Sequence, residues 1–100
     1  MQSDSLQVKV VNNTEKNRFE IESGGQISVL EYKLQADKIF LTHTDVPAAL
    51  EKQGLGSNLA HAALEYARRS GLKVVAICSF IQNYLESHPE YKPLVYGSES

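Results

Sequence analysis

A helix-forming stretch between two strand-like segments constrains the fold of this chain most. Across residues 55–67 the apolar side chains recur at three- and four-residue spacing, the pattern of a helix with one buried face. Gly71 follows at the place where helices commonly end. Residues 73–78 are β-branched and almost wholly apolar, as expected of a strand covered on both faces. This order predicts a right-handed crossover and a parallel strand pair.

The first half of the chain alternates apolar and polar residues, which predicts antiparallel strands. We expect these strands at residues 6–10, 19–22, 27–34 and 39–46. Gly24-Gly25 predicts a tight hairpin turn, and the polar residues 12–17 predict another turn.

A second helix is expected at residues 79–86, because Phe80, Ile81, Tyr84 and Leu85 form an apolar stripe. It should end at His88, because Pro89 disfavours helical geometry there. The segment from Lys92 is expected to be extended and frayed. The predicted fold class is therefore α/β (α+β). It is a mixed sheet with an antiparallel N-terminal meander, a β-α-β crossover and a C-terminal helix.

Composition narrows the classes of partner. The chain has 100 residues, 42% hydrophobic and 22% charged, which predicts one globular domain over residues 1–100. A formal net charge of −2 argues against nucleic acid as the main partner, because binding to phosphates needs a basic surface. No run of residues is apolar and long enough to predict a membrane span.

Other features of the sequence bear on the cellular location and the oligomeric state of the protein. The N-terminus lacks the basic and apolar pattern of a signal peptide, and Cys78 is the only cysteine. We therefore expect a reducing, cytoplasmic location. We also expect a monomer, or a weak dimer through an edge strand.

Gly54 and Gly56 stand at the start of the predicted crossover helix. Glycine lets a backbone pass close to a ligand, and amides at a helix start lack partners inside the helix and bind anions. The stretch therefore predicts a site for a phosphorylated cofactor. The third glycine of a dinucleotide fingerprint and the Gly-Lys-Ser of a nucleotide-binding loop are missing. No metal site is predicted, because the histidines and the cysteine lie far apart in sequence.

Four short motifs occur in order: Leu-Thr-His-Thr-Asp-Val-Pro at 41–47, Gly-Leu-Gly at 54–56, Cys-Ser-Phe-Ile at 78–81 and His-Pro-Glu-Tyr at 88–91. Together they resemble the GNAT superfamily of N-acetyltransferases, and its small single-domain branch with a cysteine on the fifth strand. The resemblance implies that the fourth and fifth strands splay apart around acetyl-coenzyme A (acetyl-CoA). It also implies transfer of the acetyl group to an amine, on a small molecule or a peptide.

The same resemblance implies which residues would bind the cofactor. The pantetheine arm would pair with the backbone of the fourth strand at Thr44, Asp45 and Val46. The diphosphate would lie on amides of the segment made of Lys52, Gln53, Gly54, Leu55, Gly56 and Ser57. The superfamily usually has Arg or Gln where this chain has Glu51. Because a carboxylate repels a polyanion, we expect Glu51 to point away.

His43 is the first candidate for the chemistry. An alkyl amine with a pKa of about 10.4 is almost entirely protonated at neutral pH, so a base with a pKa near 7 is useful. A histidine has an ordinary pKa of about 6.5, and His43 could act as the base or position the amine. The alternative is a histidine held by core hydrogen bonds beside Thr42 and Thr44. Asp45 and Glu31 could attract a cationic amine or simply be solvated.

Cys78 could accept the acetyl group or give a proton to the coenzyme A (CoA) thiolate. The acceptor role needs a lowered thiol pKa, which the helix starting near Ser79, or His43 across the cleft, could supply. The alternative is a small buried hydrophobe. The resemblance implies that Tyr84 protonates the leaving thiolate, whereas its place in an apolar stripe favours packing.

The remaining aromatic and histidine residues are expected to be structural. Tyr32 and Tyr66 are assigned to the core, and His61 to the solvated face of the first helix. His88 is expected to cap a helix or pack in a loop.

Three functions fit these observations. The first is a small acetyl-CoA-dependent N-acetyltransferase in which amine and donor meet in a ternary complex. The second is a CoA-binding module with little turnover that acts through protein contacts. The third is a structural α+β domain without a ligand.

Overall fold

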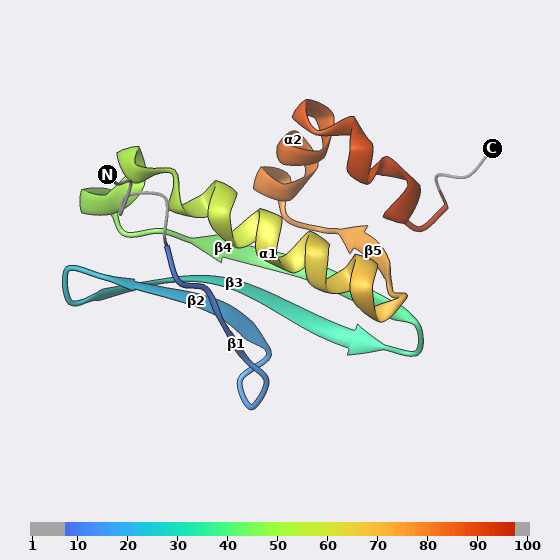
Figure 1. Ribbon diagram of the computed structural model, residues 1–100, viewed down its shortest axis with the longest axis horizontal. Coiled ribbons are helices and arrows are strands. Elements are labelled where there is room, and N and C mark those ends of the chain that lie inside the picture. The colour runs from blue at the N-terminus through green and yellow to red at the C-terminus, as the bar shows by residue number, and fades with distance from the viewer. Residues whose placement is uncertain (1–7, 98–100) are drawn as a thin grey trace.

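The computed structural model describes residues 8–97, whose strands form one five-stranded sheet in the order β1-β2-β3-β4-β5. The strands are β1 (Val11–Asn13), β2 (Arg18–Ser23), β3 (Gln26–Gln35), β4 (Lys38–Asp45) and β5 (Lys73–Ala76). The first four pair antiparallel in succession, and β4 pairs with β5 in parallel. The predicted mixed sheet, with its meander and its crossover, is confirmed (Figure 1).

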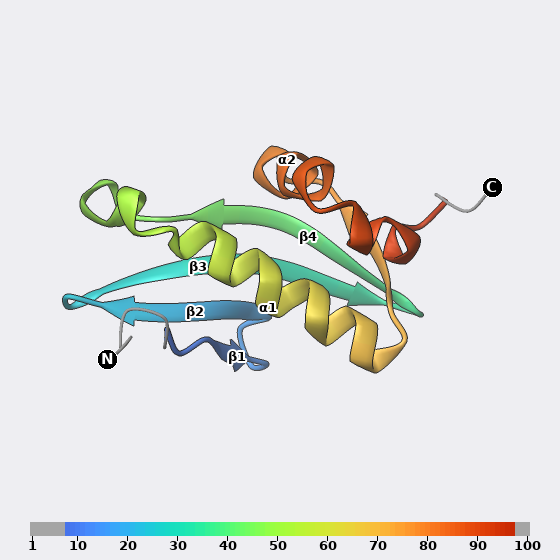
Figure 2. The ribbon, with the colours of Figure 1, turned by 45° about the horizontal axis from the view of Figure 1, so that its top comes forward.

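The crossover from β4 to β5 contains the long helix α1 (Leu55–Ser70), which lies across one face of the sheet (Figure 2). Gly71 ends α1 in the left-handed region at φ 71°, and its amide caps the last turn, as predicted. The second predicted helix is α2 (Ser79–Ser87). Among residues 8–97, no helix combines the length and the apolar character that a membrane crossing requires.

Two 3-10 helices were not predicted. One is η2 (Ala48–Gln53), between β4 and α1, and the other is η3 (Pro89–Leu94), after α2. The expectation of an extended tail from Lys92 is therefore wrong over η3, where Pro89 occupies a first-turn position that suits its fixed φ. The chain becomes extended only at Val95, which forms a parallel bridge with Val74.

The first strand lies later in the chain than predicted. Leu6 is outside the described residues, Val8 and Val10 are not in a strand, and β1 begins at Val11. The turn chemistry explains the shift: Asn13 accepts the Lys16 amide through both its main-chain and side-chain oxygens. This closes a short turn, so Asn13 pairs with Arg18 rather than lying in the turn.

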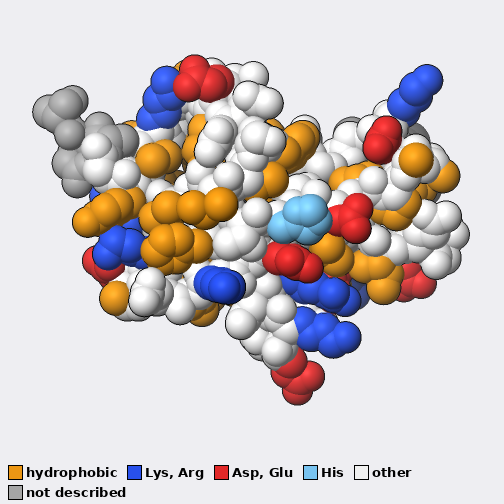
Figure 3. Space-filling view, turned by 180° about the vertical axis from the view of Figure 1, so that it is seen from behind, with side chains coloured by type: hydrophobic (Ala, Val, Ile, Leu, Met, Phe, Trp, Pro, Cys, Tyr) orange, Lys and Arg blue, Asp and Glu red, His pale blue; other side chains and the backbone are white. Residues whose placement is uncertain are grey.

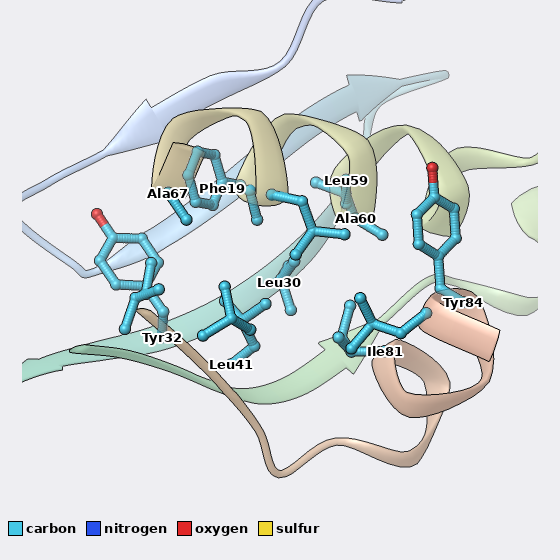
Figure 4. Packing of buried hydrophobic residues seen from close by; sticks show 14 of the residues in the cluster. Phe19, Leu30, Tyr32, Leu41, Leu59, Ala60, Ala67, Ile81 and Tyr84 are labelled. Carbon is cyan, nitrogen blue, oxygen red and sulfur yellow. The ribbon is translucent and has the colours of Figure 1, made fainter. Parts of the chain in front are cut away.

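One core joins α1 to the sheet. Figure 4 shows Leu30, Tyr32 and Leu41 of the sheet pointing toward residues of α1 such as Leu59, with side chains of α2 at one end. Leu30, Leu41 and Leu59 are fully buried.

Of the two tyrosines assigned to the core, Tyr32 is buried and its hydroxyl donates to Asn12 Oδ1 at 2.7 Å. Tyr66 lies at the edge of the core, half-buried, with its ring edge-on to Phe19.

A β-bulge in β4 decides which side chains face α1. Tyr32 pairs with Leu41 but Glu31 pairs with His43, which leaves Thr42 as the extra residue. The Thr42 hydroxyl donates to the Glu31 carbonyl at 3.1 Å and holds the bulge. Side chains of paired residues share a face of the sheet. Thr44, which pairs with Leu30, therefore faces α1 like Leu41, and His43 faces the other side.

Candidate functional site

The two parallel strands separate beside the N-terminus of α1. Their pairing ends at Leu41 and Ala76, whereas β4 continues to Asp45. The amides of Ile77 and Cys78 both donate to the Leu41 carbonyl at 3.0 Å, and the chain then turns into α2. Because β5 is paired along its whole length and ends where the pairing ends, the splay of the fourth and fifth strands that the resemblance implied stays a prediction.

A pocket of about 450 Å³ lies where β4, η2, α1 and α2 meet. Its lining residues are Thr44, Asp45, Val46, Glu51, Gly54, Gly56, Ser57 and Phe80. Gly54 caps α1 in the left-handed region at φ 73°, and no side chain of the described residues caps this helix end. The amides of Leu55, Gly56 and Ser57 therefore have no acceptor within the helix. Amides at a helix N-terminus of this kind can bind an anion, so the predicted anion site stays a prediction that the geometry allows.

Most of the residues proposed for cofactor binding come together in this pocket. Thr44, Asp45, Val46, Gly54, Gly56 and Ser57 line it. Leu55 has its side chain in the core, 2% exposed, so only its backbone is available to a ligand. Lys52 and Gln53 are exposed on η2 and do not line the pocket.

The expectation that Glu51 points away is wrong, because Glu51 lines the pocket. The 3-10 helix η2 begins after Pro47 and buries Leu50, and successive residues of such a helix point about 120° apart. With Leu50 buried, Glu51 lies outside the core, where it borders the pocket. Although Asp45 also lines the pocket, no three His, Cys, Asp or Glu side chains gather as metal ligands would within residues 8–97.

Gly56 has a second role that the sequence did not reveal. A Cβ on Gly56 would lie 2.8 Å from Cζ of Phe80, so the glycine makes room for this ring. Phe80 is 38% exposed and lines the pocket from the first turn of α2. The sequence placed Phe80 in the Cys-Ser-Phe-Ile motif and in the apolar stripe of the second helix, but gave it no role in a site; its position two residues after Cys78 was the available signal.

Cys78 lies next to this pocket, at the N-cap position of α2. Its Sγ is 3.4 Å from Oγ1 of Thr44. Burial raises the pKa of the Cys78 thiol, but the hydrogen bond with Thr44 and the backbone amides at the start of α2 stabilise the thiolate more, so the net pKa is lowered. The predicted field of the second helix is therefore present.

His43 does not lie across the cleft from Cys78. It is exposed and pairs with Glu31, on the face opposite Thr44, and Thr44 is the side chain in contact with Cys78. Its exposure also excludes the alternative of a histidine held in the core. Figure 3 shows a histidine on the rear surface with acidic side chains beside it.

Tyr84 is part of the core rather than of the pocket. It is 9% exposed, and its ring stacks on His88 with the centroids 3.9 Å apart. Burial raises the pKa of the Tyr84 hydroxyl, and the nearby carboxylates of Glu90 and Glu65 raise it further. His88 is the C-cap residue of α2, and its Nδ1 lies 2.9 Å from the Tyr84 carbonyl, so of the two expected roles it is helix capping that the structure shows.

The last motif residue, Tyr91, fastens η3 to α1. Its hydroxyl donates to Glu65 Oε2 at 2.6 Å and lies 3.0 Å from His61 Nδ1. Because the single hydroxyl proton goes to Glu65, His61 Nδ1 must carry a proton and donate to the tyrosine oxygen. His61 is exposed as expected, but it is also bonded, and the sequence gave no sign of this pairing.

Comparison with known proteins agrees with this fold. The fold is that of a GCN5-like N-acetyltransferase, and a family model described as GCN5-related N-acetyl-transferase matches residues 18–94. The chain belongs to this family, which confirms the resemblance.

Similar proteins cover most of the chain. Protein NATD1 of Homo sapiens is 31% identical over 85 residues, which are 82% of this chain and 75% of that protein. Protein NATD1 of Xenopus tropicalis is 30% identical over 88 residues, 85% of this chain and 81% of that protein. The NMR structure of a GCN5-like protein from Staphylococcus aureus is similar with a TM-score of 0.71 and 29% identity, covering 92% of this chain and 91% of that one.

Proposed function

We propose that this protein is an N-acetyltransferase that takes an acetyl group from acetyl-CoA and transfers it to an amine. The observation that carries the proposal is the pocket between the separated strands and the uncapped start of α1, which Thr44 connects to the Cys78 thiol. Membership of the GCN5-related family supports acyl transfer as the reaction class.

The residues present fit the donor. The free amides of Leu55, Gly56 and Ser57 suit a diphosphate. The edge of β4 that β5 leaves unpaired at Thr44 and Asp45, together with the following Val46, offers backbone groups to the amides of a pantetheine arm. When bound, acetyl-CoA supplies a reactive thioester. The pocket volume lies within the roughly 300–1,000 Å³ usual for ligand sites.

Cys78 and His43 are the proposed reactive side chains. The lowered pKa of Cys78 favours the thiolate, which is the nucleophilic form. In the acceptor role, Cys78 Sγ forms a thioester with the acetyl group, the CoA thiolate leaves, and an amine then takes the acetyl group from sulfur. In the alternative role, the Cys78 thiol gives its proton to the departing thiolate. We assign His43 to removing a proton from the amine, or to positioning it, on the sheet face opposite Thr44, and Tyr84 to packing.

Mass spectrometry tests the acceptor role. The protein is incubated with acetyl-CoA alone, and we expect an acetyl group on Cys78 that is missing from Cys78→Ser. An unmodified cysteine would exclude the thioester step and leave the proton-donor role. A panel of small amines and peptides then tests turnover, which we expect as steady release of free thiol that Cys78→Ser or His43→Gln reduces at least tenfold.

The second candidate is a CoA-binding module with little turnover. It is favoured by the position of His43, which is exposed and does not line the pocket, so the pocket by itself holds only a donor. Tight CoA binding without thiol release from any amine would support this candidate. A structural domain without a ligand would show no change in melting temperature, whereas a bound ligand at a hundredfold excess over its Kd stabilises by about 2.7 kcal/mol.

A further inference from the structure

We infer that Glu51 weakens the binding of coenzyme A, because it places a negative charge at the mouth of the anion site at α1. This inference rests on the proposed function. Glu51 lines the same pocket as Gly54, Gly56 and Ser57, the residues at the start of α1.

The charges around the pocket carry the argument. Of its eight described lining residues, the charged ones are Asp45 and Glu51, and none is a lysine or an arginine. A diphosphate would therefore be held by backbone amides while carboxylates oppose it. Like charges near a protein surface repel with an energy that falls with their separation.

The position of Glu51 follows from the fold rather than from its own contacts. Leu50 anchors η2 in the core at 7% exposure, and Gly54 fixes the turn into α1. The backbone of Glu51 is thus held between two constrained residues. Lys52, the adjacent cation, is exposed and does not line the pocket, so its charge does not compensate Glu51 there.

The repulsion has two consequences that can be measured. Removing the carboxylate charge should strengthen the binding of CoA, by about three- to tenfold at low salt. Salt should reduce this gain, because the Debye length shrinks from about 30 Å at 0.01 M to about 8 Å at 0.15 M ionic strength. Pantetheine lacks the diphosphate, so its binding should not respond to the change.

The experiment is isothermal titration of the full chain with CoA and with pantetheine, at low and at physiological salt. The variants are Glu51→Gln and the matched control Glu15→Gln. Glu15 is exposed in the turn between β1 and β2 and does not line the pocket. Both substitutions change the net charge equally, so their difference isolates the position of the charge.

We expect Glu51→Gln to bind CoA more tightly than wild type, Glu15→Gln to change affinity by less than twofold, and pantetheine to bind all three alike. Equal CoA affinities for the two variants would overturn the inference while leaving the donor site intact. An affinity gain with Mg²⁺ that disappears in Glu51→Gln would also overturn it, because the carboxylate would then assist binding through a cation. Failure of wild type and both variants to bind CoA would instead overturn the proposed function.

Discussion

Thr44 Oγ1 lies 3.4 Å from Cys78 Sγ and connects the end of β4 to the start of α2. The contact spans the place where β4 and β5 have separated. The contact therefore connects a pocket-lining side chain directly to the cysteine. Removing it tests whether Thr44 lowers the pKa of the Cys78 thiol.

Thr44→Val should raise the pKa of the Cys78 thiol, because the hydrogen bond with Thr44 is the largest influence that lowers it. The rate of alkylation by iodoacetamide, followed against pH, reports the thiolate. For wild type the midpoint should lie below the value of about 8.5 for a free cysteine, and for Thr44→Val it should move upward.

Thr14→Val is the control, since Thr14 is exposed in the turn between β1 and β2 and does not line the pocket. Its alkylation midpoint should equal that of wild type. If Thr44→Val shares that midpoint while remaining folded, Thr44 does not tune the thiol.

Gly56→Ala should weaken the binding of CoA while leaving the stability of the fold almost unchanged. Alanine favours helix over glycine by about 1 kcal/mol, and the clashing atom is the far end of the partly exposed Phe80 side chain. We expect the unfolding free energy to change by less than about 1 kcal/mol. Binding of CoA should weaken at least tenfold, because the new methyl group and the displaced ring enter the pocket. Tight binding by Gly56→Ala would show that the glycine serves only the packing of Phe80.

Ser28→Ala should stabilise the protein. Among the described residues, Ser28 Oγ is fully buried and has no hydrogen-bond partner. An unsatisfied buried hydroxyl carries a desolvation penalty, so its removal should add about 1 kcal/mol to the unfolding free energy in urea. Ser87→Ala, at an exposed position on α2, should change stability by less than about 0.5 kcal/mol. A loss of stability in Ser28→Ala would mean that the hydroxyl is bonded in solution.

Tyr91→Phe should make stability less dependent on acid pH. The hydrogen bond from Tyr91, and then the one from Arg68, lower the pKa of Glu65. A carboxylate with a depressed folded-state pKa contributes stability above its unfolded pKa of about 4.3. That stability is lost as the pH falls through the folded-state value. Without the Tyr91 hydroxyl, the pKa of Glu65 in the folded state moves toward its value in the unfolded state.

Chemical denaturation at several pH values between about 3 and 7 measures this effect. Wild type should lose more stability than Tyr91→Phe over that range. Tyr96→Phe is the control, because Tyr96 is 57% exposed and its ring meets Lys38 rather than a carboxylate. Parallel stability profiles for wild type and Tyr91→Phe would show that Glu65 does not depend on Tyr91.

Local patterns were sufficient for much of the fold. The spacing of apolar residues in α1, Gly71 at its end and the apolar run of β5 gave the crossover, because a buried helix face leaves a periodic signature. The strand itself is less covered than predicted, since Val74 is its one buried residue. The first strand was misplaced because the side chain of Asn13 closes a turn that hydrophobic alternation does not reveal. The 3-10 helices were missed because such short segments have almost no period to detect.

The candidate site, too, was predictable from the sequence only in part. Gly54 and Gly56 marked the uncapped start of α1 in advance, since the amides at a helix start follow from the helix itself. His43 could not be oriented from the sequence, because a single extra residue at Thr42 reverses which side chains face α1.

The amino-acid sequence by itself determined the order of the elements, the crossover and the uncapped start of α1, because these depend on residues that are near one another in the chain. Only the tertiary structure decided that Thr44 meets Cys78, that Glu51 and Phe80 border the pocket, and that Tyr91 joins Glu65. The residues in these contacts lie far apart along the chain. The geometry of the contacts depends on strand register and on the burial of neighbours such as Leu50.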